Sequence, residues 1–535
     1  PRYIDMDKCI ACGLCAEKCP AKTANEFEEG LSKRKAAYLP YAQAVPLKYV
    51  IDPERCIYFK KGKCRACEKY CPTGAVNFEE QEEILDLQVG SVIMTTGMQP
   101  FDPSSIDGYQ YNAFPNVVTS LEFERILAAE GPTKGHVVRL SDNQPAKRIA
   151  WLQCVGSRDM NTSSNEYCSG VCCMYAIKEA VMAKEHVGRD FQPAIFFMDM
   201  RTSGKDFEKY YTKAEKDGVR FIRSRVHTIT QVDDSGTLSL EFATDDGQLK
   251  REEFDMAVLS VGMEPADSAS QIADSLGIEL NSHSFVKTGD TSPVSTNRPG
   301  VFVAGVAQGC KDIPQSVMEA SAAACHAGIE LASARGTAVR EKEFPAEKEI
   351  DPNDIRIGVF VCNCGSNIGG VADVPAIAEF TRGLPHVAYV EENQFTCSQD
   401  TQEKMAQTIK DNDLNRVVVA ACTPRTHEPL FQETIQGSGL NPYLFEMANI
   451  RNQCTWCHSQ DKDKATAKSK DLVRMAVAKA AKLEPIPELS VDVDKSALVI
   501  GGGVAGMTAA LSLAGQGFPV TLVEKAPELG GAARD

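Results

Sequence analysis

Two runs of cysteine near the start of the chain have the spacing of iron–sulfur ligands. The first run is C-x2-C-x2-C-x3-C-P, and it consists of Cys9, Cys12, Cys15 and Cys19. The second run has the same order with a longer first gap, and it consists of Cys56, Cys64, Cys67 and Cys71. In such runs three thiolates converge on one cubane, while the fourth cysteine, redirected by a proline, ligates the other cubane. The pattern therefore predicts two crossed clusters, one completed by Cys71 and the other by Cys19.

Zinc is the alternative metal for cysteines at this spacing. A zinc ribbon uses two C-x2-C pairs, whereas both runs here are longer and end in C-P. Thiolates are soft ligands that suit either metal, so the spacing decides, and it favours two [4Fe-4S] clusters. Residues 1–85 also have few strand signals, as expected of a small domain in which clusters substitute for a hydrophobic core.

The cysteine count also indicates the redox compartment. The chain has 535 residues and 20 cysteines, most of them in metal-ligand spacings, which predicts a reducing, cytoplasmic setting. The net charge of −16 is spread along the chain, so nucleic acid is not an expected partner. The longest apolar stretch, 497–523, is interrupted by six glycines. It therefore predicts a buried strand–turn–helix and not a membrane span.

A glycine-rich turn near the end of the chain predicts a dinucleotide site. The apolar strand 497–500 runs into G-x-G-x-x-G, formed by Gly501, Gly503 and Gly506. These glycines permit a tight turn and bring a pyrophosphate close to a helix N-terminus. Glu524 ends the next apolar strand, at the offset from which a carboxylate accepts hydrogen bonds from a ribose hydroxyl.

The elements that position these residues follow an alternating pattern. In residues 86–335 helical patterns alternate with short apolar runs at 91–94, 148–152, 194–198 and 301–304. After a linker-like stretch at 336–354, apolar runs resume at 356–361 and 416–421. Such alternation predicts parallel sheets with helices on both faces. We therefore expect an α/β protein with four parts, at residues 1–85, 86–335, 355–482 and 495–535.

Several segments resemble the flavoprotein disulfide reductase family. Residues 528–531 continue the glycine-rich turn as in that family, whose dinucleotide is FAD. Segments 95–100 and 260–265 resemble its A-T-G-x-x-P turns, and 297–305 resembles the strand that closes its FAD site. Val306 departs from the family, which has an aspartate at this position. The resemblance implies doubly wound sheets and a flavin site that includes Gly97, Gly305, Gln308 and the helix at Pro314, whose N-terminal amides would point at the flavin.

Four cysteines stand where this family has its nicotinamide site. The strand 148–153 runs into Cys154 and not into a second G-x-G-x-x-G, and Cys168, Cys172 and Cys173 follow. Because thiolates are soft ligands, a turn that holds four of them favours a metal cluster over NAD. Buried free thiols are the alternative, since cysteine is among the most buried residue types.

The pattern around these cysteines narrows the resemblance. Residues 153–176, with Q-C-V-G-S-R-D and then Y-C-S-x-V-C-C-M-Y-A, look like HdrA, the iron–sulfur flavoprotein component of heterodisulfide reductase. Two further segments, 305–314 and 361–365, also resemble that component, as does the insertion of a ferredoxin in a flavoprotein. The resemblance therefore covers essentially the whole chain. The parts stand in a different order from that family. This order implies an internal fragment of a tandem duplication, or two joined genes, with neither FAD site complete within the chain.

The resemblance also implies a further cubane in residues 355–482. The candidate ligands are Cys362, Cys364, Cys397, Cys422, Cys454 and Cys457, of which four suffice. Two of these cysteine segments follow apolar strands, so their thiols should gather at the carboxyl edge of a parallel sheet. His458 is a conceivable ligand, but it is expected to be a surface or structural histidine. Cys310 and Cys325 have no spacing pattern and are expected to be small apolar core residues.

The resemblance implies a function in electron transfer. The chain would be an iron–sulfur flavoprotein subunit that converts electron pairs at FAD into single electrons and passes them along [4Fe-4S] clusters, in bifurcation or confurcation. The implied partners are ferredoxin and other redox subunits, of the disulfide-reducing type and with hydrogenase, formate or NADH input modules, in a multi-subunit complex. No residue stands out as a catalyst of proton transfer. The alternatives are a purely conductive polyferredoxin adaptor and a flavin enzyme that reduces a small molecule, although the usual cysteine pair beside such a flavin is absent from the sequence.

Overall fold

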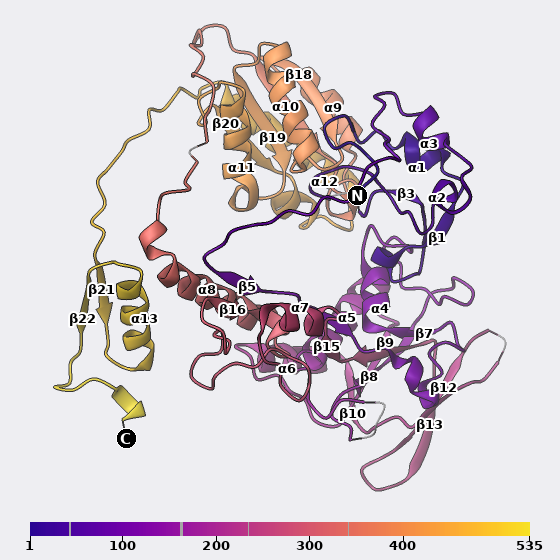
Figure 1. The fold of residues 1–535 in the computed structure, drawn as a ribbon. Helices are drawn as coiled ribbons and strands as arrows, with labels where there is room; N and C mark the ends of the chain where they lie inside the picture. The colour runs from indigo at the N-terminus through magenta and orange to yellow at the C-terminus, as the bar shows by residue number, and fades with distance from the viewer. Residues whose placement is uncertain (42–43, 161–163, 234, 341, 535) are drawn as a thin grey trace. The chain divides into compact units, whose positions relative to one another are not determined.

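The computed structural model describes residues 1–41, 44–160, 164–233, 235–340 and 342–534. Its contacts divide the chain into two units. The first unit combines residues 1–84 with 340–491, and the second combines residues 85–339 with 492–535. Figure 1 shows the course of the chain through the elements of each unit. Asp535, the last residue of the part expected to begin a second Rossmann unit, lies outside the described residues.

Residues 1–84 form short elements around the two cysteine runs. The helices are α1 (Leu14–Lys18), α2 (Ile57–Lys61) and α3 (Ala66–Lys69). Two antiparallel pairs accompany them, β1 (Lys22–Ala24) with β2 (Lys33–Lys35), and β3 (Ala37–Tyr38) with β4 (Val50–Ile51). The buried core includes four of the cysteines, namely Cys9, Cys15, Cys56 and Cys67. The thiols therefore occupy the interior of this segment, where a larger domain has apolar side chains.

Residues 340–491 form a doubly wound parallel sheet, drawn in orange in Figure 1. The strand order is β18 (Val387–Asn393), β17 (Ile357–Cys362), β19 (Arg416–Ala421) and β20 (Phe445–Asn449). Helices α9 (Val374–Arg382) and α12 (Lys462–Ala480) pack together, as do α10 (Gln399–Asp411) and α11 (Pro424–Gly437). Every residue of β17 and β19 is buried, so helices cover both faces. The chain reverses its direction of travel across the sheet between these two strands.

The second unit is built on a five-stranded parallel sheet. Its order is β10 (Arg220–Arg223), β9 (Gln192–Phe197), β8 (Arg148–Val155), β14 (Met256–Val261) and β7 (Val117–Thr119). The helices that follow these strands are α4 (Ser120–Leu127), α5 (Cys172–Val187) and α6 (Phe207–Lys216). An antiparallel sheet of β11 (Thr228–Gln231), β12 (Leu238–Ala243) and β13 (Leu249–Phe254) adds to the same hydrophobic core. The strands β8 and β14 lie next to each other in its centre.

A two-stranded ribbon connects this sheet to a smaller lobe. The lobe contains the parallel pair β5 (Val92–Met94) and β16 (Val301–Val303), with helices α7 (Ala269–Leu276) and α8 (Ile313–Glu330). An antiparallel ribbon of β6 (Met98–Pro100) and β15 (Met263–Pro265) joins the lobe to the five-stranded sheet. One strand of the ribbon carries the chain out of the lobe and the other carries it back.

The last residues of the chain form a strand–helix–strand unit. The parallel strands are β21 (Ala497–Ile500) and β22 (Val520–Val523), and helix α13 (Val504–Gly515) connects them. Helix α13 packs against α8. At this contact the Gln516 side chain donates a hydrogen bond to the Cys325 sulfur, with a distance of 3.1 Å between Nε2 and Sγ. Cys325 is half-buried and hydrogen-bonded, so the expectation that it is an apolar core residue is wrong.

The predicted α/β architecture is confirmed. Strands are present at each of the predicted apolar runs, with ends that differ by a few residues, and the two larger sheets are parallel. The stretch 497–523 forms the predicted strand–turn–helix, but the prediction that it is buried is wrong: α13 has no buried residue, and Leu498 and Ile500 of β21 are 62% and 80% exposed. Within the described residues no helix is both long enough and apolar enough to span a membrane. The four-part division of the chain stays a prediction.

Candidate functional site

The cysteines of residues 1–84 lie close enough together to interact electrostatically. Cys15 interacts with Cys9 and Cys12, and burial raises the pKa of its thiol to about 12. Cys67 interacts with Cys56 and Cys19, and burial raises the pKa of its thiol to about 11. Cys67 also interacts with Cys15, so these interactions show that the two runs lie close together, and the crossed assignment stays a prediction. The buried thiols are expensive to ionise without a cation, as expected of ligands that need a metal centre.

Cys71 is the predicted fourth ligand of the cluster held by Cys9, Cys12 and Cys15. The Cys71 sulfur accepts a hydrogen bond from the amide of Ala75 at 3.2 Å, and Cys12 and Cys64 are exposed. Among the described residues, no group of three His, Cys, Asp or Glu side chains is arranged to hold a single metal ion. A cubane binds each thiolate through a separate iron, so its ligands need not meet at one point. The pairing of Cys71 with the first run stays a prediction.

The four cysteines that replace the nicotinamide turn lie together at the carboxyl end of β8. Cys154 interacts electrostatically with Cys168, and both interact with Cys172 and Cys173 at the start of α5. Burial raises the pKa of the Cys172 thiol to about 12. The backbone of Cys154 has a φ of 61°, a left-handed conformation that non-glycine residues adopt at an energetic cost. The strand therefore ends in a strained turn that brings Cys154 to the other three thiols.

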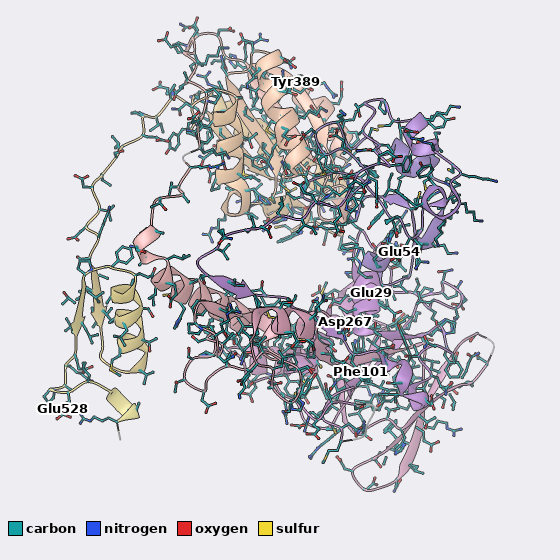
Figure 2. All side chains as sticks on the ribbon, viewed as in Figure 1. Glu29, Glu54, Phe101, Asp267, Tyr389 and Glu528 are labelled. Carbon is teal, nitrogen blue, oxygen red and sulfur yellow. The ribbon has the colours of Figure 1, made fainter. Side chains whose placement is uncertain are left out.

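Close packing shapes this turn. A Cβ at Gly156 would lie 2.1 Å from the ring of Phe101, which is labelled in Figure 2, so only glycine fits there. The Ser169 hydroxyl lies 3.1 Å from the Ser157 hydroxyl and accepts a hydrogen bond from the Met263 amide at 2.8 Å. These serines tie the segment between Cys154 and Cys172 to the turn after β14. The cysteines thus lie on a rigid frame, as a ligand set requires.

Charged and sulfur groups border the four cysteines. The Arg158 guanidinium bonds to the Asp199 carboxylate, lowers the pKa of that carboxyl, and interacts with Cys154. Cys310 interacts electrostatically with Cys168, and its thiol donates to the Met263 carbonyl at 3.7 Å. Cys310 is half-buried beside a cysteine cluster, so its expected place in an apolar core is wrong. The only signal in the sequence was its position within the motif 305–314.

Three cysteines converge in residues 340–491. Cys362 ends β17, Cys422 follows β19, and Cys397 follows β18. Cys397 interacts electrostatically with Cys362 and Cys422, and burial raises the pKa of its thiol. The strands β17 and β19 flank the point where the direction of travel across the sheet reverses, which is where parallel sheets form their sites. The Arg451 guanidinium faces Cys397 and Cys422 and favours their thiolate forms.

The other predicted ligands of this region are placed differently. Cys454 is fully buried, and its thiol bonds to the Ala465 carbonyl at 3.0 Å and lies 3.2 Å from the Ser469 hydroxyl. Its cysteine neighbour is the exposed Cys457, which is not part of the convergent group. Cys364 is half-buried at the turn after β17. The structure therefore brings Cys362, Cys397 and Cys422 together but does not bring Cys454 to them.

The glycine-rich turn has the geometry of a dinucleotide site. Gly501 has a φ of 107°, and a Cβ at Gly506 would lie 1.8 Å from the Gly501 carbonyl oxygen. Gly503 is the residue before α13, whose N-terminus is therefore open to a pyrophosphate. The Glu524 carboxylate accepts a hydrogen bond from the Gly502 amide at 2.6 Å. The turn thus places a carboxylate beside the glycines, as recognition of a ribose requires.

The flavin residues predicted in the smaller lobe surround the start of α8. Asp312 caps this helix, and Pro314 is in its first turn. The buried Lys311 ammonium bonds to Glu319 at 2.8 Å, to Gln308 at 2.7 Å and to the Gly305 carbonyl at 3.0 Å. Gly97 and Gly305 both have a positive φ. Lys311 therefore holds the segment 305–308 on α8, in the place where the sequence predicts the flavin.

Three protein-family models match parts of the chain. A 4Fe-4S dicluster domain matches residues 8–75, which supports iron–sulfur clusters in that segment. A pyridine nucleotide-disulphide oxidoreductase domain matches residues 196–324, and an NAD(P)-binding Rossmann-like domain matches residues 499–535. The last two support the binding of FAD and an oxidoreductase role.

Curated relatives of the HdrA type match about two thirds of the chain. An HdrA iron–sulfur protein of CoB–CoM heterodisulfide reductase from Methanopyrus kandleri is 45% identical over 339 residues, which are 62% of this chain and 50% of the relative. Its counterpart from Methanocaldococcus jannaschii is 41% identical over 338 residues, with the same coverage of both chains. The HdrA component of H2:CoB-CoM heterodisulfide,ferredoxin reductase from Methanothermobacter thermautotrophicus is 38% identical over 368 residues, 68% of this chain and 53% of the relative. The chain spans about half the length of these relatives.

Solved structures give a weaker likeness. Thioredoxin reductase from Lactococcus lactis matches 56% of this chain and 86% of that protein, with 18% identity and a TM-score of 0.31. A TM-score of this size supports no statement about the site. The sequence matches and the geometry of the cysteines and glycines carry the assignment.

Proposed function

Because the chain is related over about two thirds of its length to the HdrA component of heterodisulfide reductase, we propose that it is an electron-transfer subunit of a complex of that type. It would carry single electrons between an FAD site and partner subunits through four [4Fe-4S] clusters. Two clusters belong to residues 1–84, one to the cysteines after β8, and one to the cysteines after β17, β18 and β19. The chain's own thiolates hold the clusters, and its glycine-rich turn and α8 hold the dinucleotide.

The convergence of Cys154, Cys168, Cys172 and Cys173 carries this proposal most directly. A pyridine nucleotide enzyme needs a glycine-rich turn at the end of β8, so that the backbone approaches a pyrophosphate. Here thiols fill that position. This turn offers no glycine-rich site for the pyrophosphate of a nicotinamide cofactor, but it offers four soft ligands for a metal cluster. Electrons would therefore enter and leave this sheet one at a time.

The residues near the dinucleotide support a flavin. FAD supplies the exchange between electron pairs and single electrons when it is bound. The order of the parts implies that neither FAD site is complete within the chain, but α13 and α8 pack together in one unit. We therefore propose a single site, in which Glu524 and the amides of α13 hold the adenosine and pyrophosphate half and the α8 N-terminus faces the ring. The buried Lys311 pairs with Glu319 and bonds to Gln308, so it fixes the segment at that helix start that would face the ring.

The names of the relatives suggest which donors and acceptors the chain would serve. A relative is called a ferredoxin reductase that also acts with H2 and a heterodisulfide. We infer that this chain bifurcates or confurcates electrons between a low-potential ferredoxin and a disulfide-reducing partner, with a hydrogenase, formate or NADH module as donor. Each cluster's potential would be set by hydrogen bonds to sulfur, burial and nearby charge, as with Arg451 beside Cys397.

The test is a count of cofactors on the full chain, prepared without oxygen. Four clusters of four irons would give about 16 iron atoms with a similar amount of sulfide. Flavin that is released on denaturation would support the bifurcating role. Iron without flavin would overturn that role in favour of a conductive adaptor. Folded protein that is colourless and free of iron would overturn the whole proposal.

A further inference from the structure

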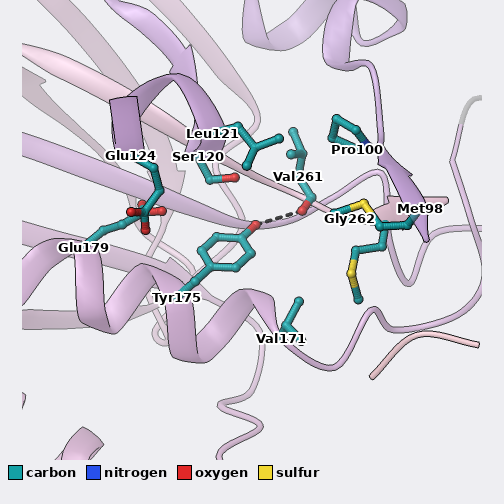
Figure 3. A pocket seen from close by; sticks show the side chains of 11 residues that line it. Met98, Pro100, Ser120, Leu121, Glu124, Val171, Tyr175, Glu179, Val261 and Gly262 are labelled. Atoms are coloured by element: carbon teal, nitrogen blue, oxygen red, sulfur yellow. Dashed lines mark hydrogen bonds between the residues drawn. The ribbon is translucent and has the colours of Figure 1, made fainter. Parts of the chain in front are cut away.

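Two carboxyl groups lie side by side behind the cysteines of α5, at one end of a cavity of about 280 Å³. Figure 3 shows Glu124 on α4 and Glu179 on α5, with their carboxyl groups facing each other at the cavity wall. The rest of the wall is mostly apolar and includes Met98, Leu121 and Val261. Nothing in the sequence spacing marks these two glutamates, because strand and helix packing brings them together.

The surroundings of Glu179 favour the binding of a proton. Its Oε2 accepts a hydrogen bond from the Trp151 indole at 2.8 Å. Its Oε1 is buried and has no hydrogen-bond donor among the described residues. The neighbouring Glu124 carboxylate is an acceptor, so a proton on Glu179 supplies the missing bond. Burial raises the pKa of Glu179 well above its usual range, and the charge of Glu124 raises it further.

The pair is also open to exchange of protons with water. Glu124 is half-buried, and both of its oxygens accept hydrogen bonds from the Lys178 ammonium, at 2.7 and 2.8 Å. The charged or titratable groups that face Glu179 in the described structure are Glu124 from α4 and Lys178 and Tyr175 from α5. Strand β8 contributes the neutral indole. One ammonium thus faces two carboxyl groups, an arrangement that is neutral with one proton on the pair.

A hydroxyl connects the pair to the cysteines. The Tyr175 hydroxyl donates to the Val261 carbonyl at 2.8 Å, and the Cys172 thiol reaches the same oxygen at 3.6 Å. Tyr175 is half-buried and interacts with both Cys172 and Glu179. Cys172, Tyr175 and Glu179 are spaced by three and four residues, so they share one face of α5. The acid pair and the thiols are therefore neighbours in an interior with little water, where charges interact strongly.

We propose that Glu124 and Glu179 form a proton-binding site coupled to the cluster held by Cys154, Cys168, Cys172 and Cys173. When the cluster gains an electron, the pair, which is ionised while the cluster is oxidised, gains one proton on Glu179 that enters from solvent past Glu124, and when the electron leaves the proton returns. One O–H bond forms per electron, and no other bond changes. This inference depends on the proposed cluster. The electron comes from the flavin or the neighbouring clusters of the proposed function.

A redox titration of the full, cluster-loaded chain at several pH values tests the proposal. The electron paramagnetic resonance signal of this cluster is identified as the one that Cys168→Ala removes. One proton per electron makes the potential fall as the pH rises, with a tenfold change in proton activity per pH unit equivalent to 59 mV for a one-electron couple. In Glu179→Gln and in Glu124→Gln we expect less than a third of this slope. The control Glu208→Gln, on the exposed side of α6, keeps it.

A second measurement protects the test against a variant that fails to fold. The reduced-minus-oxidised infrared spectrum should contain a protonated carboxyl band that is lost in Glu124→Gln, a change at a half-buried residue. A cluster whose potential does not change with pH in the parent chain would overturn this inference alone. The same holds if both variants keep the slope. If Cys168→Ala removes no iron and no signal, the proposed cluster itself is wrong.

Discussion

Cys362 and Cys422 lie at the carboxyl edge of one sheet, one residue out of register with each other, because β17 and β19 are hydrogen-bonded parallel neighbours that pair Val361 with Ala420. Cys362 is the last residue of β17, and Cys422 is the first residue after β19. Cys397 joins them from the end of β18, on the other side of β17. Three ligands of a predicted cluster therefore depend only on the strand order of the sheet.

Replacement of Cys422 by alanine should remove the cluster of residues 340–491. We expect a loss of about four irons from the full chain, since a cubane that lacks one thiolate is not retained. The matched control is Cys454→Ala, which should keep the iron. That variant should lower the free energy of unfolding by about 1 kcal/mol through loss of the hydrogen bond to Ala465. Iron analysis and thermal unfolding measure both effects, and equal iron loss in the two variants would contradict this ligand set.

Cys67→Ala should remove one cubane from residues 1–84 and destabilise this segment. The thiol belongs to a core with few large apolar side chains, so loss of its cluster removes much of what holds the segment together. Cys12→Ala should remove the other cubane in the same way. Limited proteolysis and iron analysis provide the readout, with Cys325→Ala as the control. An unchanged iron content would show that the ligand assignment is wrong.

Gly506→Ala should weaken flavin binding roughly 10- to 100-fold. A Cβ at this position would overlap the Gly501 carbonyl oxygen, and relief of such overpacking costs about 1–3 kcal/mol or opens the turn. The comparison variant is Ala509→Ser, which changes an exposed position of α13. Flavin released on denaturation gives the occupancy of each protein. Equal flavin contents would place the dinucleotide elsewhere.

Glu179 should make the stability of its unit decrease as the pH rises above about 4.5. The folded state holds the Glu179 proton while the unfolded state releases it, because burial raises the pKa of this carboxyl in the fold. The unfolded state then binds fewer protons, so the free energy of unfolding falls with increasing pH until the folded pKa is passed. Glu179→Gln should remove this slope. Chemical unfolding at pH 5 to 8 compares the variant with the parent, and identical slopes would show that Glu179 is ionised in the fold.

The parts predicted from sequence are those in which neighbours along the chain form the structure. The cysteine runs, the turn at Gly501 and the apolar strands all depend on local spacing, and the structure contains each of them. The convergence of Cys154 with Cys172 was also predictable, because a strand and the helix that follows it share one end. These features needed only the periodicity of strands and helices.

The parts that sequence reasoning missed depend on contacts between distant segments. Cys310 joins the cysteines after β8 only because the chain returns through the ribbon to Met263. Glu124 and Glu179 meet because α4 and α5 pack together. Nothing in the sequence distinguishes them from surface glutamates. Cys454 carried a plausible spacing, but a π-helical turn at 451–455 directs its thiol into α12. No local pattern in the sequence indicates these placements.

In the proposed function, the ribbon of β6 and β15 sets the distance between the flavin in the lobe and the cluster after β8. Both chain crossings between the lobe with α8 and the five-stranded sheet pass through its two short strands. The Met263 carbonyl within it receives hydrogen bonds from Tyr167 and Cys310, one from each side of the junction. The rate of electron tunnelling falls exponentially with the distance between donor and acceptor. A small bend of this ribbon would therefore change the rate of electron transfer between the proposed flavin in the lobe and the proposed cluster after β8.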